Sequence, residues 1–279
     1  MFVLLYLFFE IDNGLIIPTY WLNGFNKCPI CQFANLLYNR SMRPDTAHQL
    51  LKLNHQFYQT FAKEFSDTRQ RLQPGVVKVV SALPHTARLL DLGCGNGYLA
   101  DYIMRQGHTG PYIGMDMSED LIEIARGLRL SNAQFMVGDL ADPKWEKTIP
   151  HRPFDYIFCF AVLHHIPGHK LRIDFFKKVY ELLAPDGCFI QSNWQFLNSE
   201  RLRERIQPWS RIGLRDQDVD ENDYLLDWRR GGEGLRYVHY YTSKEMHTLA
   251  AQTGFKVSGM FTSDGETGNL GLYQIWAKD

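Results

Sequence analysis

Short apolar runs of strand length alternate with helical stretches along most of the chain. Successive runs fall at Ala87–Leu92, Tyr112–Asp116, Ala133–Val137, Phe154–Phe160 and Cys188–Trp194. The stretches between them have helical length and pattern. Parallel neighbours need such crossover connections, and the helices then cover both faces of the sheet. The pattern therefore predicts a doubly wound α/β fold.

The C-terminal segment predicts a different ending for this sheet. Thr242-Ser-Lys-Glu245 has the form of a capping box, and the helix that it opens is expected to end at Gly254. Two apolar runs, Phe255–Thr262 and Gly271–Ala277, follow, with a turn rich in Gly, Asp and Asn between them. We therefore expect a closing antiparallel hairpin and a seven-stranded, mostly parallel sheet.

The segment before the first strand predicts a helical N-terminal cap at residues 42–84. Apolar residues recur at three- and four-residue steps from Pro44 onward, which indicates a helix of about five turns that stops near Ser66. A second, short helix is expected from Pro74 to Pro84. Residues 85–279 then form the α/β domain. Its segment 195–241 has no clear strand period, and we interpret it as a lid inserted before the last helix.

Residues 1–41 differ from the rest of the chain. They have no helical or strand period and contain an isolated Cys28-Pro-Ile-Cys31. We interpret them as a dispensable or misassigned extension, with Met42 as the natural start. Half of a zinc knuckle is the alternative, although no second Cys or Cys/His pair is present. The apolar run Met1–Phe9 is too short to span a membrane, so we expect no membrane attachment.

Cysteine content and net charge bear on the cellular compartment of the protein and on nucleic-acid binding. The five cysteines are odd in number and irregularly spaced, which argues against a disulfide framework and favours the reducing cytoplasm. The net charge of -1 gives the whole chain no signature of a nucleic-acid binder. Charge is nevertheless segregated, because the arginine-rich segment 201–215 precedes the acidic segment 216–227. Segment 201–215 is therefore the best candidate for an RNA-facing patch.

A glycine-rich stretch at residues 89–97, Leu-Leu-Asp-Leu-Gly-Cys-Gly-Asn-Gly, joins the first strand to the next helix. Glycines there let the backbone approach a ligand, and the helix N-terminus offers free N–H groups. A dinucleotide fingerprint would need a third glycine where Tyr98 stands. The stretch therefore predicts a nucleotide-type site but disfavours NAD or FAD.

This stretch resembles motif I of the class I S-adenosylmethionine-dependent methyltransferases, which share a Rossmann-like fold. Asp116 matches the family's ribose-binding acid, and Asp139 with Leu140 matches its adenine contact. Residues 154–167 resemble the strand and loop beneath the transferable methyl group, and residues 182–187 resemble the turn before strand five. The resemblance implies S-adenosylmethionine as the cofactor. The implied cofactor-binding residues are Asp91, Gly93, Cys94, Gly95, Asn96, Gly97, Asp116, Met117, Asp139, Leu140, Phe160 and Ala161.

Segments outside the core resemble the eukaryotic tRNA wobble-uridine methyltransferases, which esterify 5-carboxymethyluridine. The matching stretches are residues 57–69, the Asp-Trp-Arg-Arg-Gly-Gly of 227–232, residues 236–241 and residues 268–276. A carboxylate acceptor is already ionised near neutral pH, so the protein needs cations to position it rather than a base. The candidate catalytic residues are Arg69, His164, Arg229, Arg230 and His239. We expect no metal ligands.

Other interpretations stay open. The arginines of segment 195–241 also fit a solvated lid in which they pair with neighbouring acids, and His164 also fits a structural loop position. The alternative function is methylation of a small molecule on O, N or C, which predicts a narrow apolar pocket under a closed lid. A non-catalytic S-adenosylmethionine-binding protein is a third, weaker alternative. No feature of the sequence shows whether the protein works with a helper subunit.

Overall fold

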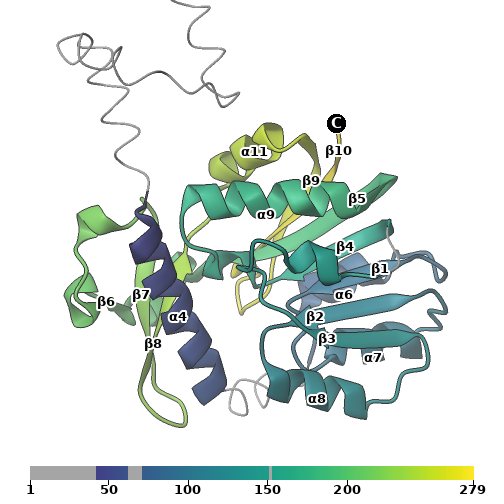
Figure 1. Ribbon diagram of the computed structural model, residues 1–279, viewed down its shortest axis with the longest axis horizontal. Helices are drawn as coiled ribbons and strands as arrows, with labels where there is room; N and C mark the ends of the chain where they lie inside the picture. Colours follow the sequence, from purple (N-terminus) through teal and green to yellow (C-terminus); the bar gives the residue numbers. More distant parts are fainter. Residues whose placement is uncertain (1–41, 62–70, 151–152) are drawn as a thin grey trace, which may run out of the picture. The chain divides into compact units, whose positions relative to one another are not determined.

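A computed structural model describes residues 42–61, 71–150 and 153–279. Its main element is a seven-stranded sheet with the strand order β3-β2-β1-β4-β5-β10-β9 (Figure 1). The strands are β1 (Leu89–Leu92), β2 (Tyr112–Asp116), β3 (Ala133–Val137), β4 (Phe154–Phe160), β5 (Leu183–Trp194), β9 (Phe255–Ser263) and β10 (Gly271–Lys278). The interpretations of residues 1–41, of the Cys28/Cys31 pair and of Arg69 lie outside the described residues.

The strand directions confirm the predicted doubly wound sheet. Strands β3, β2, β1, β4 and β5 are mutually parallel. Strand β10 lies between β5 and β9 and is antiparallel to both, which is the expected closing hairpin. Strand β1 has β2 on one side and β4 on the other, so the order reverses there. Ligands of open α/β sheets bind at the carboxyl ends of the strands beside such a reversal.

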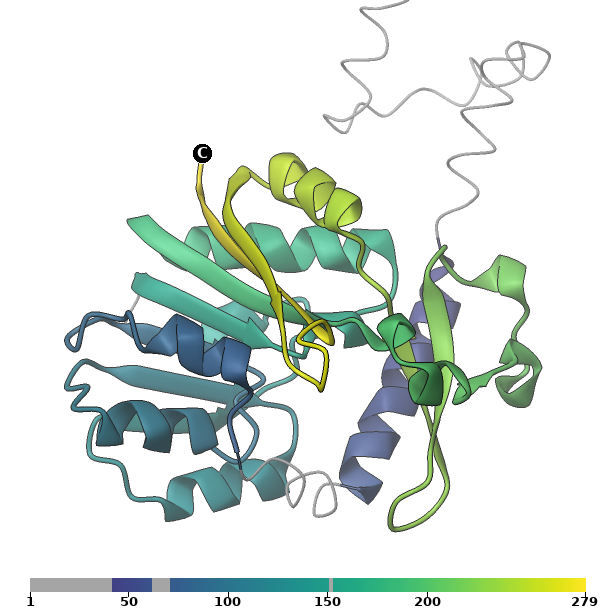
Figure 2. The ribbon, with the colours of Figure 1, turned by 180° about the vertical axis from the view of Figure 1, so that it is seen from behind.

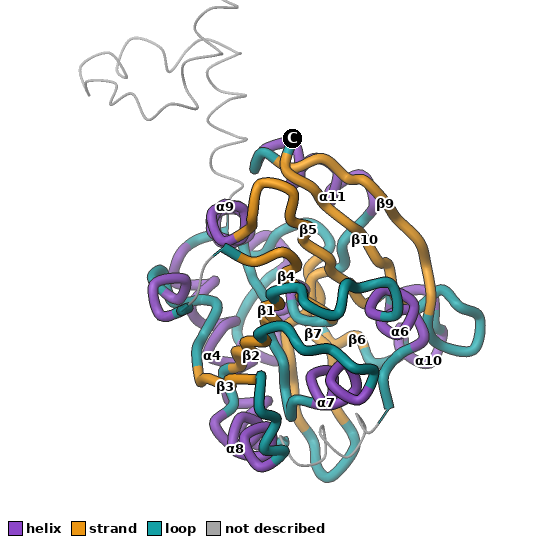
Figure 3. The backbone as a smooth tube through the Cα atoms, turned by 90° about the vertical axis from the view of Figure 1, so that its right-hand side faces the viewer, coloured by secondary structure: helices purple, strands orange, loops and turns teal. Residues whose placement is uncertain are grey.

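Helices cover both faces of the sheet, as Figures 2 and 3 show from the back and from the side. Leu89 faces one apolar core and Leu90 the other, because successive side chains of a strand alternate between faces. The Leu89 face is covered by α6 (Pro74–Val80), α7 (Tyr98–Arg105) and α8 (Glu119–Gly127). The Leu90 face is covered by α9 (His169–Leu182) and α11 (Ser243–Gln252).

Local sequence signals explain where several helices begin and end. The Thr242 side chain accepts a hydrogen bond from the backbone N–H of Glu245 at the start of α11, as the capping-box pattern predicts. Helix α6 begins at Pro74 as expected but ends at Val80, four residues before Pro84. Proline disfavours helical backbone in the residue before it, so the chain leaves the helix earlier as a turn.

Segment 195–241, which shows no clear strand period in the sequence, contains a second sheet. Three antiparallel strands pair in the order β6-β7-β8. They are β6 (Ile206–Gln207), β7 (Asp223–Trp228) and β8 (Gly234–His239). The segment also holds α10 (Glu200–Arg203) and the 3₁₀ turns η4 (Phe196–Asn198), η5 (Trp209–Ile212) and η6 (Asp216–Asp218). Two further 3₁₀ turns in the main domain are η2 (Trp145–Thr148) and η3 (Leu163–His165).

Buried polar residues explain why this small sheet has no visible strand period. Asp223, Arg236 and His239 are all buried, although their types normally mark the solvent face of a strand. Leu225 and Leu226 are also both buried, so both faces of β7 are covered. Strands covered on both faces do not show the alternation by which a half-exposed strand is recognised.

Helix α4 (Pro44–Thr60) packs against the small sheet, on strand β8 (Figure 1). Leu50 joins Leu225 and Tyr237 in a separate apolar cluster. The Asn54 side chain also accepts a hydrogen bond from the Tyr237 N–H at 2.8 Å and donates one to the Tyr237 carbonyl at 3.1 Å. The helix itself is confirmed, whereas its expected end near Ser66 lies outside the described residues. Since α6 packs on the main sheet, the two helices expected as one cap belong to different layers.

Candidate active site

The glycine-rich loop between β1 and α7 has left-handed backbone at three positions. Gly93, Gly95 and Gly97 have φ values of +83°, +55° and +75°. A Cβ atom at Gly93 would lie 2.2 Å from the Val162 side chain, and one at Gly97 would lie 2.8 Å from Cβ of Ala125. A Cβ at Gly95 would meet nothing within 4 Å. Two glycines therefore permit close packing of the loop, while Gly95 faces open space that a ligand can fill.

Two carboxylates lie beside this loop, the buried Asp91 and the half-buried Asp116. Asp116, at the end of β2, accepts hydrogen bonds from the backbone N–H groups of Gly95 and Ser118, each at 2.9 Å. Burial raises the pKa of Asp116, and these hydrogen bonds oppose the rise. Asp91 accepts a hydrogen bond from the Tyr112 hydroxyl at 2.5 Å. Burial raises the pKa of Asp91 to about 7, the Tyr112 hydrogen bond lowers it, and the nearby Asp116 adds to the rise.

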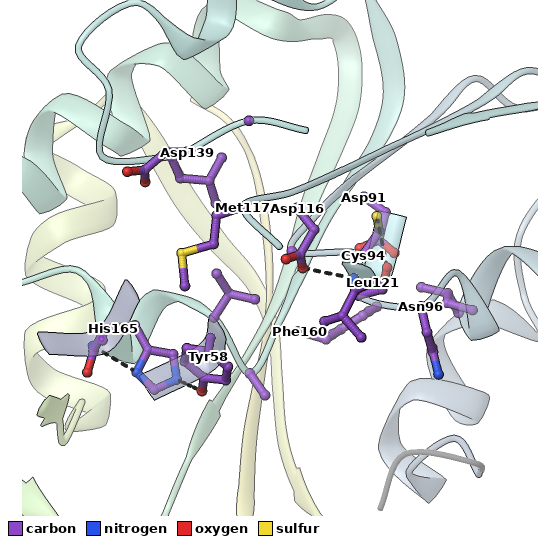
Figure 4. A pocket seen from close by; sticks show the side chains of 18 of the residues that line it. Tyr58, Asp91, Cys94, Asn96, Asp116, Met117, Leu121, Asp139, Phe160 and His165 are labelled. Atoms are coloured by element: carbon purple, nitrogen blue, oxygen red, sulfur yellow. Dashed lines mark hydrogen bonds between the residues drawn. The ribbon is translucent and has the colours of Figure 1, made fainter. Parts of the chain in front are cut away.

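One pocket at the carboxyl ends of the strands contains this loop (Figure 4). Of the residues that the methyltransferase resemblance assigns to the cofactor, Gly97 does not line the pocket, because its position packs against Ala125. The assigned residues that do line it are Asp91, Gly93, Cys94, Gly95, Asn96, Asp116, Met117, Asp139, Leu140, Phe160 and Ala161. The residues assigned from the sequence thus lie at the carboxyl ends of four strands, β1, β2, β3 and β4, around one pocket.

The other end of the same pocket is formed by α4 and the loop after β4. Successive turns of α4 line this end of the pocket with Leu51, Asn54, His55 and Tyr58. The loop after β4 contributes Val162, His165 and Ile166, and the segment before α6 contributes Arg71, Leu72 and Gln73. We call this part the acceptor end. Arg71 is the one arginine or lysine among the described residues that line the pocket.

Tyr58 and His165 point toward one another at the acceptor end (Figure 4). The Tyr58 hydroxyl lies 2.6 Å from Nε2 of His165, and Nδ1 of His165 lies 3.1 Å from the Tyr237 carbonyl oxygen. Nδ1 of His165 also lies 3.3 Å from Nδ2 of Asn54, so this ring nitrogen faces both a carbonyl oxygen and an amide donor. Contacts with α4 and with the backbone of β8 therefore hold both side chains at this end of the pocket.

None of the described candidate catalytic residues lines the pocket, although the His164 ring is 4.2 Å from that of His165. His164 is buried and does not line the pocket, whereas its neighbour His165 does. Arg229 and Arg230 are exposed in the turn between β7 and β8, and Arg229 is paired with Asp227 at 2.8 Å. Neither arginine lines the pocket. Arg69 lies outside the described residues.

His239 also lies outside the pocket lining, in a buried charged network. Its Nδ1 is 2.7 Å from Asp223, and its Nε2 is 2.9 Å from Glu245. Arg172 of α9 contacts the same two carboxylates at 3.2 and 3.5 Å, and the Tyr237 hydroxyl donates to Asp223 at 2.6 Å. Both ring nitrogens of His239 are therefore occupied by carboxylates. The expected role in positioning the acceptor does not fit this geometry, because the side chain joins β8 to β7 and α11 instead.

Sequence reasoning missed Asn54, Tyr58 and His165 as pocket residues. Leu51, Asn54 and Tyr58 follow the same three- and four-residue steps as the apolar face of α4. The polar residues Asn54 and Tyr58 at these helical steps could have indicated a binding site on α4. The resemblance of residues 154–167 covers both His164 and His165, but only the fold shows that His165 lines the pocket.

Neither a metal cluster nor a membrane-spanning helix is found in the described part of the chain. In residues 42–61, 71–150 and 153–279, no three His, Cys, Asp or Glu side chains are grouped so that they could hold a metal ion. No helix in the same ranges has the length and apolar character needed to cross a membrane.

Comparison with known proteins identifies the family of the pocket. A family model described as a methyltransferase domain matches residues 58–258. The chain belongs to this methyltransferase family. The matched region includes the glycine loop, both carboxylates and the loop after β4, so it contains residues from both ends of the pocket.

Curated relatives match parts of the chain. The tRNA (carboxymethyluridine(34)-5-O)-methyltransferase of Saccharomyces cerevisiae is 32% identical over 50% of this chain and 47% of its own length. The tRNA (carboxymethyluridine(34)-5-O)-methyltransferase ALKBH8 of Macaca fascicularis is 31% identical over 50% of this chain and 19% of its own length. A trans-aconitate 2-methyltransferase of Variovorax paradoxus is 30% identical over 50% of this chain and 48% of its own. The chain thus spans half or less of the length of these relatives.

Solved structures share the fold. A S-adenosylmethionine-dependent methyltransferase of Methanosarcina mazei has a TM-score of 0.57 and 22% identity, over 74% of this chain and 98% of that one. The 1,6-didemethyltoxoflavin-N1-methyltransferase of Burkholderia thailandensis has a TM-score of 0.59 and 16% identity, over 83% of this chain and 90% of that one. These likenesses confirm the class I methyltransferase fold.

The pocket fits S-adenosylmethionine, the cofactor that the motif order and the family assign to this chain. The space in front of Gly95 leaves room for a ligand against the loop backbone. Asp116 and Asp91 place carboxylate oxygens in the same pocket, where hydroxyl or ammonium groups can donate to them. The chain therefore has the fold and the cofactor pocket of a S-adenosylmethionine-dependent methyltransferase domain.

Proposed function

We propose that this methyltransferase esterifies a carboxylate, and that its acceptor is the 5-carboxymethyl group of a tRNA wobble uridine. The observation that carries the proposal is a single pocket that joins the glycine loop to an acceptor end lined by Tyr58, His165 and Arg71. The names of two kinds of curated relative support it, since carboxymethyluridine and trans-aconitate both carry carboxylates. Tyr58 and His165 are proposed as acceptor contacts in place of His164 and His239.

A carboxylate suits the chemistry that these residues offer. Free carboxylic acids have pKa values near 4, so the acceptor is ionised at neutral pH and needs no base. Arg71 gives the acceptor end a positive charge that attracts it. S-adenosylmethionine supplies the methyl group from its sulfonium. The acceptor oxygen forms a bond to the methyl carbon as the carbon–sulfur bond breaks, and the electron pair of that bond stays on sulfur.

The protein contributes alignment and the exclusion of water. The Gly93–Gly97 loop and Asp116 would hold one reactant, and α4 with the loop after β4 would hold the other. Bringing both into one pocket in the geometry of in-line attack removes much of the entropic cost of reaction. Apolar side chains at the acceptor end, Leu51, Leu72 and Ile166, would keep water from the reacting atoms.

A small-molecule acceptor is the second candidate function. The same apolar side chains favour it, and the trans-aconitate 2-methyltransferase has a small carboxylic acid in its name. A small carboxylic acid would also give a methyl ester, so size and charge distinguish it from the tRNA acceptor. The tRNA acceptor requires an additional contact surface outside the pocket.

Methyl transfer from labelled S-adenosylmethionine to bulk tRNA, compared with a metabolite extract, tests the proposal. We expect label in tRNA, and we expect mild alkali to release it as methanol, because esters hydrolyse where N-, C- and ether-linked methyl groups do not. Label only in small molecules would refute the tRNA acceptor. Label that resists alkali would refute the carboxylate. Arg105→Gln, at an exposed position on α7, serves as the active control.

A further inference from the structure

Arg236 on β8 lies in an aromatic cage. The central carbon of its guanidinium is 4.9 Å from the ring centre of Trp194, 5.3 Å from that of Phe57 and 5.6 Å from that of Trp228. These rings come from the end of β5, from α4 and from the end of β7. Only 8% of Arg236 is exposed. We call this arrangement the Arg236 cage.

The guanidinium in this cage has no anionic partner among the described residues. No carboxylate of residues 42–61, 71–150 or 153–279 pairs with it, and its buried Nε has no hydrogen-bond acceptor there. The buried Arg172, in contrast, contacts Asp220, Asp223 and Glu245. Aromatic faces attract a cation but accept few of its five N–H donors. A buried charge whose N–H donors lack acceptors destabilises the folded protein, and a bound anion would offset this cost.

The cage adjoins the acceptor end of the pocket. Phe57 precedes the pocket residue Tyr58 on α4, and their ring centres are 5.1 Å apart. The Trp194 ring lies 6.3 Å from that of His164, whose neighbour His165 lines the pocket. Trp194 and Trp228 are each partly exposed, whereas Arg236 between them is buried. None of the four cage residues lines the pocket, so Arg236 would contact a group of the acceptor other than the one that enters the pocket.

We propose that the Arg236 cage binds an oxyanion of the methyl acceptor, either a carboxylate or a phosphate. The planar guanidinium matches both groups with two parallel hydrogen bonds, and the tryptophan rings can stack on a planar part of the same molecule. This proposal deepens the proposed function and rests on it for the identity of the acceptor. The anion site itself does not depend on which acceptor is methylated.

Tryptophan fluorescence tests the site without turnover, because two of its walls are indoles. Sodium phosphate and sodium acetate are titrated at constant ionic strength, with chloride as the reference anion. We expect a saturable change in the wild type. Arg236→Lys keeps the positive charge over the rings but cannot make two parallel hydrogen bonds to one oxyanion. The apparent affinity of this variant for the anion should therefore fall about tenfold. Arg105→Gln, which removes an exposed arginine from α7, should respond like the wild type.

Trp228→Phe keeps a ring in the wall and should reduce the amplitude of the change without abolishing anion binding. This second variant locates the signal even if Arg236→Lys does not fold. Thermal unfolding and cofactor titration of each variant separate a binding defect from a folding defect. An equal response in the wild type and in folded Arg236→Lys, or no saturable response to either anion, would overturn the anion site. An unchanged amplitude in Trp228→Phe would place the binding elsewhere and overturn it as well.

Two competitors distinguish the sources of the oxyanion. The nucleoside 5-carboxymethyluridine has a carboxylate and no phosphate, whereas uridine 5′-monophosphate has a phosphate and no carboxylate. Competition by the first alone assigns the cage to the acceptor carboxylate, and competition by the second alone assigns it to a backbone phosphate. If neither competes, the acceptor assignment fails. A saturable, Arg236-dependent response with no methylation of tRNA would refute the proposed function while leaving the anion site intact.

Discussion

At the scale of single residues, Asp91 and Asp116 show how burial prepares a pocket for a cation. Both carboxylates lie beside the glycine loop, and burial raises the pKa of each. Asp91 also faces the negative charge of Asp116, which adds to the rise. A positively charged ligand in the pocket would reverse this effect by favouring the ionised forms.

Asp91 should make stability and cofactor binding depend on pH. Its pKa is about 7 in the folded protein against 3.8 for the ordinary group, so its contribution to stability is fully present below about pH 4 and is lost as the pH rises through 7. We expect the melting temperature of the ligand-free protein to fall between about pH 4 and 7, by roughly a few degrees, and to level off above that range. The cationic cofactor should raise the melting temperature more at pH 8 than at pH 6.

Asp91→Asn is the matched control for this prediction, because it keeps the shape and removes the titration. Differential scanning calorimetry of both proteins with and without S-adenosylhomocysteine and S-adenosylmethionine measures the effect. The same pH profile in Asp91→Asn would show that another group titrates.

His165, rather than His164, should support methyl transfer. His165→Asn and Tyr58→Phe each break the hydrogen bond between the two side chains, and we expect each to lower kcat/KM for the acceptor about tenfold or more through misalignment. Cofactor affinity should change little. His164→Asn alters a buried residue outside the pocket lining, so it should act mainly on stability.

Steady-state kinetics with varied acceptor, together with cofactor titration, compares the three variants. A larger drop of kcat/KM in folded His164→Asn than in His165→Asn would contradict the placement of the pair.

At the scale of elements, the charged network of Arg172 connects parts of the chain that are far apart in sequence. Arg172 lies on α9, Asp223 on β7, His239 on β8 and Glu245 on α11. The network therefore fixes the small sheet against the helices that cover the main sheet. Strand β8 also carries the Tyr237 carbonyl that lies 3.1 Å from Nδ1 of His165, so the network and the acceptor end share this strand.

Removing one member should cost far more stability than removing a surface ion pair. Arg172→Gln leaves Asp223 buried without its cation, and we expect a decrease of about 3–5 kcal/mol in the free energy of unfolding. Arg105→Gln breaks an exposed i,i+4 pair and should cost at most about 0.5 kcal/mol. Urea unfolding followed by circular dichroism measures both changes. A small effect of Arg172→Gln would mean that the network contributes little to the folded state.

At the scale of the whole molecule, near-zero net charge conceals local segregation. The chain carries 30 Lys and Arg against 31 Asp and Glu. Arg201, Arg203 and Arg211 are exposed, and none of them pairs with a carboxylate among the described residues. Arg215 is paired with Asp218 at 3.0 Å. The cationic surface of segment 201–215 is therefore narrower than the count of its arginines indicates.

Charge reversal at Arg201, Arg203 and Arg211 should weaken tRNA binding in a salt-dependent way. We expect the triple variant with Glu at these positions to reduce the slope of log affinity against log salt by about one for each phosphate that is no longer neutralised. Filter binding of tRNA at several salt concentrations measures the slope. Arg215→Glu is the comparison, since Arg215 is already paired. An unchanged slope in the triple variant would exclude this surface from RNA binding.

Local sequence patterns were enough to predict the main sheet and the cofactor end of the pocket. Apolar runs, caps and the glycine loop act locally, and parallel strands place their carboxyl ends at one edge, so Asp91, Asp116 and Asp139 necessarily come together there. Only the tertiary structure decided the acceptor end. The strands of segment 195–241 owe their burial to α4 and to the Arg172 network, and those interactions join residues that are far apart in the chain. Whether His164 or His165 faces the cavity, and whether His239 or Arg236 lacks an anion, follows from such long-range packing and not from local pattern.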